Sequence, residues 1–118
     1  MIIDTHIHLD DERYKNDLEE VLNRAREAGV KRFIIPGADA SHLKRAVEIS
    51  ESNDDVYFAV GIHPYDIKSF NEEDLDSYMG HNKCVAVGEC GLDYFRLEGS
   101  DEDRKSTRLN SITWPSRM

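Results

Sequence analysis

Short apolar runs alternate with longer amphipathic stretches along most of the chain. The apolar runs predict buried strands, and they lie at residues 1–4, 32–35, 56–60 and 85–88. In the stretches between them, apolar residues recur at three- and four-residue spacing, which predicts amphipathic helices. A strand–helix alternation of this kind is typical of a parallel sheet covered by helices.

The ends of the predicted helices are marked by capping residues. Asn16 is expected to cap the first helix and Gly29 to end it, after a polar loop at residues 10–16. The second helix is expected over residues 41–52, and the third between Asn71 and Gly80. The expected inner faces consist of Leu18, Val21, Leu22, Ala25 and Ala28, then Leu43, Ala46 and Val47, then Leu75, Tyr78 and Met79.

Two closures fit this alternation: an open doubly wound sheet, or the first half of a (β/α)₈ barrel. Polar side chains follow successive predicted strands, with His6 and His8 after the first, His63 after the third and Glu89 after the fourth. Barrel enzymes build their sites from the ends of several strands, whereas open sheets bind ligands near one switch point. We therefore predict an α/β fold, a partial TIM barrel with its first four strands. A whole barrel needs about 250 residues, and the chain has 118.

His6 and His8 suggest a metal site by their spacing alone. In a strand, residues i and i+2 point to the same side. Two imidazoles at one strand end therefore aim at one point, and a divalent metal is the usual reason for that arrangement. A strand that merely ends in polar residues is the alternative.

Composition narrows the class of protein further. The net charge is −9, and an acidic surface does not attract nucleic acid without bound cations. No apolar run approaches the roughly 20 residues that span a bilayer, and no basic leader precedes the first strand, so we expect a cytoplasmic protein without membrane contact. Cys84 and Cys90 lack the spacing of a zinc site and are expected to be thiols.

Three motifs resemble those of the TatD family of metal-dependent deoxyribonucleases. They are Asp-Thr-His-Ile-His-Leu-Asp at residues 4–10, Gly-Ile-His-Pro at residues 61–64 and Val-Gly-Glu-Cys-Gly-Leu-Asp-Tyr at residues 87–94. The resemblance implies a TIM barrel of the metallo-dependent hydrolase type. It also implies a site for two divalent ions and hydrolysis of phosphodiester bonds, with DNA or another phosphoester as substrate. Histidine and carboxylate ligands fit Mg, Mn or Zn. The resemblance implies no particular protein partner.

The resemblance also assigns roles to residues. It implies that His6 and His8 bind one metal, and that Glu89 is the catalytic carboxylate that bridges both metals. A carboxylate suits that role because its two oxygens can span ions about 3.5–4 Å apart. His63 is expected to bind substrate, beside the phosphate or behind the metal ligands.

The family pattern continues beyond what this chain contains. Two further histidines and an aspartate, expected after later strands, have no match here. Residues 1–103 are thus predicted to be the N-terminal half of a barrel with open edges at its first and fourth strands. Two alternatives remain: another amidohydrolase-like or PHP-type metallo-phosphoesterase, and a truncated, inactive metal-binding fragment.

Residues 104–118 differ in charge from the rest of the chain. All 24 acidic residues precede this segment, which carries only basic charges, at Arg104, Lys105, Arg108 and Arg117. We interpret it as a foreign basic tail, an artefact of the sequence. A natural basic tail that binds nucleic acid is the alternative.

Overall fold

The computed structural model describes residues 1–63 and 71–91, in which strands and helices alternate as predicted. The elements are β1 (Ile2–Asp4), the 3-10 helix η1 (Glu12–Tyr14), α1 (Leu18–Glu27), β2 (Val30–Ile35), α2 (Ala40–Ser52), β3 (Val56–Val60), α3 (Glu72–Met79) and β4 (Cys84–Val87). Within these two ranges, no helix has both the length and the apolar character to cross a membrane.

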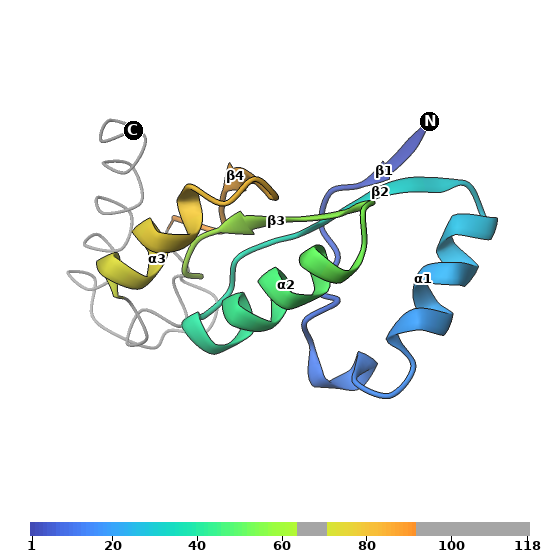
Figure 1. Cartoon of the computed structure of the whole chain (residues 1–118), viewed down its shortest axis with the longest axis horizontal. Coiled ribbons are helices and arrows are strands. Elements are labelled where there is room, and N and C mark those ends of the chain that lie inside the picture. Colours follow the sequence, from blue (N-terminus) through green and yellow to red (C-terminus); the bar gives the residue numbers. More distant parts are fainter. Residues whose placement is uncertain (64–70, 92–118) are drawn as a thin grey trace.

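The four strands form one parallel sheet in the order β1-β2-β3-β4. Each strand pairs with the next along the chain, as in a barrel, whereas a doubly wound sheet reverses its strand order at a switch point. Figure 1 shows α1 and α2 along the same face of the sheet. The predicted partial barrel is therefore confirmed.

The core lies between the sheet and these helices. Phe33 of β2 and Phe58 of β3 are fully buried at its centre. Each helix contributes a leucine to the same cluster: Leu22 from α1, Leu43 from α2 and Leu75 from α3. Burying an apolar side chain of this size stabilises a fold by about 1.5–3 kcal/mol, so these contacts hold the helices against the sheet.

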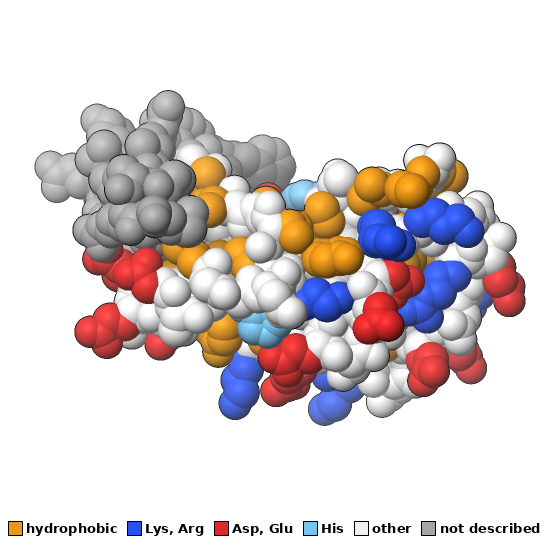
Figure 2. Space-filling view, turned by 45° about the horizontal axis from the view of Figure 1, so that its top comes forward, with side chains coloured by type: hydrophobic (Ala, Val, Ile, Leu, Met, Phe, Trp, Pro, Cys, Tyr) orange, Lys and Arg blue, Asp and Glu red, His pale blue; other side chains and the backbone are white. Residues whose placement is uncertain are grey.

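The expectation that the first strand is buried was wrong. Ile2 is 56% exposed and Ile3 47% exposed, and Val85 of β4 is 50% exposed. In the described part of the chain, β1 pairs only with β2 and β4 only with β3, so both are edge strands with a face left open. Figure 2 shows hydrophobic side chains reaching the surface on the face that it displays. Among the described residues, β1 and β4 are thus the edge strands of the sheet, as predicted.

Two of the helices begin at other residues than expected. Helix α1 begins at Leu18 with Asp17 at the capping position, and no side chain caps it. Asn16 does not cap because the chain is still turning at residues 15–17, after η1. Helix α2 begins at Ala40, and the Asp39 carboxylate accepts a hydrogen bond from the His42 N–H.

The other predicted helix ends are confirmed. The Asn71 side chain accepts hydrogen bonds from the N–H groups of Glu73 and Asp74, which satisfies donors that have no partner inside α3. Gly29 follows α1 with a φ of 105°, a conformation that favours glycine. Gly80 follows Met79 and caps the carboxyl end of α3.

A bidentate ion pair ties α1 to the turn before β3. Arg26 donates to both oxygens of Asp55, over 2.7 Å from Nε and 2.8 Å from Nη2, and Nη2 also donates to Asn53. The hydrogen bond from Arg26 lowers the pKa of the Asp55 carboxyl below its usual range. A group whose pKa is depressed by folding stabilises the folded state above its unfolded pKa, and loses that effect as the pH falls through its folded pKa.

We therefore expect Arg26→Met to lower the free energy of unfolding by about 1 kcal/mol near neutral pH, because the pair is partly exposed. The difference from wild type should be constant above about pH 5 and should shrink as the pH falls through the depressed pKa of Asp55. Urea unfolding at several pH values measures this, with Asp54→Asn at the exposed neighbouring position as control. A difference that does not change with pH would contradict the assignment.

Candidate metal centre

The chain leaves β1 in a conformation that keeps two histidines on one side. The Asp4 carboxylate accepts a hydrogen bond from the His6 N–H (3.1 Å). The Ile7 N–H donates to the Ile34 carbonyl of β2 (3.2 Å), so strand-like pairing continues between the two histidines. The rings of His6 and His8 lie edge to face, with centroids 5.0 Å apart and planes at 86°.

Glu89 reaches the same point from the far edge of the sheet. One ligand atom from each of His6, His8 and Glu89 lies within 4.8 Å of the other two. His8 Nε2 lies 3.9 Å from Glu89 Oε2. The side chains of His8 and Glu89 are 38% and 31% exposed, so the cluster is open to solvent. The structure thus brings together the three predicted ligands, whereas their binding of a metal stays a prediction.

The donor set suits a divalent ion. Imidazole nitrogens with a carboxylate are common ligands of Zn²⁺, and related sets hold Mn²⁺. Two atoms bound to one ion at about 2.1 Å are at most about 4.2 Å apart. The separations in the cluster therefore need only small side-chain rotations to reach coordination.

Asp10 is a site residue that the sequence analysis missed. We expected it in a polar loop, but its side chain is only 3% exposed, and its Oδ1 lies 3.9 Å from His8 Nδ1. That oxygen is buried without a hydrogen-bond partner. Burial raises the pKa of the Asp10 carboxyl, although a backbone hydrogen bond and the nearby His8 act to lower it. The available signal was spacing, since Asp10 follows His8 by two residues.

Metal-binding histidines usually donate their second ring N–H to a carboxylate or carbonyl. In this structure His8 presents Nε2 to Glu89 and Nδ1 to Asp10, on opposite sides of the ring. If His8 binds a metal through Nε2, its Nδ1–H needs an acceptor, and the unpaired oxygen of Asp10 lies on that side of the ring. This observation supports the fit of a metal to the cluster.

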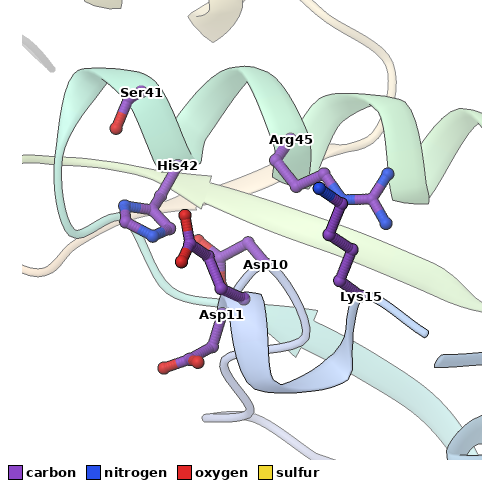
Figure 3. Close-up of a pocket in the computed structure, with 7 residues that line it drawn as sticks. Asp10, Asp11, Lys15, Ser41, His42 and Arg45 are labelled. Carbon is purple, nitrogen blue, oxygen red and sulfur yellow. The ribbon is translucent and has the colours of Figure 1, made fainter. Parts of the chain in front are cut away.

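A cavity of about 520 Å³ is lined in part by Asp10, whose Oδ1 approaches His8 of the cluster. Its lining consists of Asp10, Asp11, Glu12, Lys15, Ser41, His42 and Arg45. Figure 3 shows Asp10 near His42, with the Asp11 carboxylate pointing away from His42, while Lys15 lies near Arg45.

His42 of α2 forms an ion pair with Asp39. Burial acts to lower the pKa of His42, but the hydrogen bond and charge of Asp39 outweigh it, so that the pKa is raised.

His63 lies outside the three-residue cluster among the described residues. Its backbone N–H donates to the Ala38 carbonyl (2.8 Å), which ties the end of β3 to the segment after β2. Its predicted role in substrate binding stays a prediction. The motif residues Pro64 and 92–94, and the tail at 104–118, lie outside the described residues.

The fold and cluster together define half of a (β/α)₈ barrel with histidines and a carboxylate at its strand ends. The profile of the family described as TatD related DNase matches residues 3–112. The chain therefore belongs to the TatD family. The match extends beyond residue 103, where we predict the foreign tail to begin, and that boundary stays a prediction.

Similar proteins are about twice as long as this chain or longer. An uncharacterized metal-dependent hydrolase of Bacillus subtilis, YabD, is 41% identical over 115 residues, which cover 95% of this chain and 45% of YabD. The 3'-5' ssDNA/RNA exonuclease TatD of Edwardsiella piscicida is 33% identical over 99 residues, covering 80% and 38%. The crystal structure of the Escherichia coli TatD homologue YjjV matches with a TM-score of 0.85 at 32% identity, covering 98% of this chain and 47% of YjjV. The chain thus spans less than half the length of these relatives.

The buried carboxylate of Asp10 leads to a stability prediction. A buried polar group without a partner costs about 1–3 kcal/mol, and functional sites commonly carry such a cost. We expect Asp10→Asn to leave the metal-free chain as stable as wild type, or more stable by about 1 kcal/mol. Urea unfolding without metal measures this, with Glu12→Gln at an exposed position two residues further on as control. A clear loss of stability in Asp10→Asn alone would show that the carboxylate stabilises the fold.

Proposed function

We propose that this chain is part of a metal-dependent hydrolase that cleaves phosphodiester bonds of nucleic acid, with single-stranded DNA as the first substrate to test. The observation that carries the proposal is the convergence of His6, His8 and Glu89 from opposite edges of the sheet. Membership of the TatD family supports the reaction class, and the name of the Edwardsiella relative supports the substrate class.

In this proposal each residue has a distinct task. His6 and His8 would hold one ion through ring nitrogens, and Asp10 would accept a hydrogen bond from the His8 Nδ1–H, which keeps Nε2 free to bind. Glu89 has two oxygens and could serve two ions. Bound divalent ions would supply an activated water and neutralise charge on the phosphoryl oxygens. His63 follows β3 and would contact the substrate phosphate.

The charge of the chain is consistent with this division of tasks. A net charge of −9 repels a polyanion. Asp4, Asp10 and Glu89 all lie at or near the cluster, so their negative charge favours cations at the place where phosphate must approach. Metal binding would therefore precede substrate binding.

A second candidate is a metal-binding fragment that performs no chemistry. The observation that favours it is length, because the chain covers only 45% and 38% of the two curated relatives. The open edges at β1 and β4 agree with a missing half. Among the described residues, the cluster offers a second ion no ligand besides Glu89.

Metal titration followed by a cleavage assay separates the candidates. We expect calorimetry of the 118-residue chain with Mn²⁺ to show binding that His6→Ala and Glu89→Gln weaken. His42→Ala, a histidine outside the cluster, is the matched control and should bind as wild type does. The nuclease proposal further expects EDTA-sensitive cleavage of an end-labelled single-stranded oligodeoxynucleotide, lowered at least about 100-fold by Glu89→Gln. An RNA oligonucleotide tests the breadth of the substrate class.

The possible outcomes separate the nuclease from the inactive fragment. Binding with Glu89-dependent cleavage supports the nuclease. Binding without cleavage supports the fragment, and the nuclease proposal is then withdrawn for this chain. Binding that His6→Ala and Glu89→Gln leave unchanged, or no binding at all, contradicts both candidates.

A further inference from the structure

Three glycines meet where β2, β3 and β4 end. The Gly37 N–H donates to the Gly88 carbonyl (2.8 Å), and the Glu89 N–H donates back to the Gly37 carbonyl (2.9 Å). The Gly88 N–H donates to the Val60 carbonyl of β3 (2.9 Å). We call Gly37, Gly61, Gly88 and the backbone of Glu89 the strand-end junction.

The junction is too close-packed for any side chain at two of its positions. A methyl group on Gly37 would lie 2.4 Å from the nitrogen and 2.6 Å from the oxygen of Gly61, and 2.7 Å from the oxygen of Gly88. A methyl group on Gly61 would lie 2.5 Å from the carbonyl carbon of Gly88 and 2.6 Å from the oxygen of Glu89. All of these neighbours are backbone atoms, which cannot rotate away as a flexible side chain could. An alanine at either position therefore has to push the Gly88–Glu89 segment aside.

We propose that Gly37 and Gly61 are positioning residues that set where Glu89 stands relative to His6 and His8. The proposal rests on the metal-binding role proposed for that cluster. Residues after β2 hold the Glu89 backbone through its N–H, and residues at the end of β3 hold it from the adjacent side. With its backbone fixed from both sides, Glu89 retains only side-chain rotations to reach the histidines.

The expected displacement is large enough to matter. Relieving the contacts of 2.5–2.7 Å with Gly88 and Glu89 to an ordinary separation moves this segment by about 1 Å, and a displacement of that size can cost a site about 100-fold. The fully buried phenylalanines Phe33 and Phe58 lie earlier in their strands. The effect should therefore fall on Glu89 more than on the core.

Gly80 provides a matched control. It ends α3 with a φ of −81°, and a methyl group there would meet nothing within 4 Å. Gly37→Ala, Gly61→Ala and Gly80→Ala thus make the same chemical change in crowded and open surroundings.

The experiment compares Mn²⁺ affinity and amide hydrogen exchange in these variants of the 118-residue chain. We expect Gly37→Ala and Gly61→Ala to weaken Mn²⁺ binding at least about tenfold and to speed exchange at the Glu89 amide. The Phe33 N–H donates a hydrogen bond to the Asp55 backbone carbonyl. This amide should stay protected as the marker of an intact core. Gly80→Ala should match wild type in both measurements.

If both crowded variants match Gly80→Ala in affinity and in Glu89 exchange, the proposal is overturned. If wild type binds no Mn²⁺, the proposed function fails, while exchange at Glu89 still decides whether Gly37 and Gly61 hold this segment. If Gly37→Ala and Gly61→Ala do not fold, amide exchange in the wild-type chain decides whether the junction holds Glu89. Protection of the Glu89 and Gly37 amides comparable to that of Phe33 then supports the junction, and exchange at the rate of an open chain overturns it.

Discussion

Parallel pairing of consecutive strands is the constraint on which the rest of this structure depends. Because every strand runs in the same direction, the carboxyl ends of all four meet at one edge of the sheet. Residues far apart in sequence, such as His6 and Glu89, are thereby brought within reach of one ion. The backbone hydrogen bonds among Gly37, Gly88 and Glu89 extend this pairing past the strands themselves. The sheet thus supplies both the core and the geometry of the candidate site.

The same edge of the sheet carries the features that do least for stability. Asp10 is buried with an unpaired oxygen, and the cluster gathers a carboxylate and two imidazoles where apolar residues would pack better. Local rules of good packing tend to be broken at functional sites and satisfied elsewhere. Here the compensation lies below the site, in Phe33, Phe58 and the leucines of the three helices. In the described part of the chain, the exposed side chains of Ile2, Ile3 and Val85 are a separate weakness.

Much of this architecture could be predicted from periodicity and spacing. Short apolar runs and amphipathic stretches define the strands and helices, and the i, i+2 spacing of His6 and His8 predicts their common direction. The exposure of Ile2 and Ile3 in β1 could not be predicted. It depends on which neighbour the strand has across its outer edge, and the sequence pattern does not show that neighbour. Asp10 was assigned to a loop because its neighbours are polar, whereas its burial arises in the tertiary structure, which this local pattern does not show. The crowding at Gly37 is a contact between three strand ends, and no local pattern encodes it.

The most direct test of the central claim is the location of a bound metal. Anomalous scattering from crystals of the 118-residue chain grown with Mn²⁺ would place the ion without reference to activity. The account predicts a peak at coordination distance, about 2.0–2.2 Å, from a nitrogen of His6, a nitrogen of His8 and an oxygen of Glu89. A peak bound instead by carboxylates of the neighbouring cavity, such as Asp11 and Glu12, with none at the cluster, would contradict it.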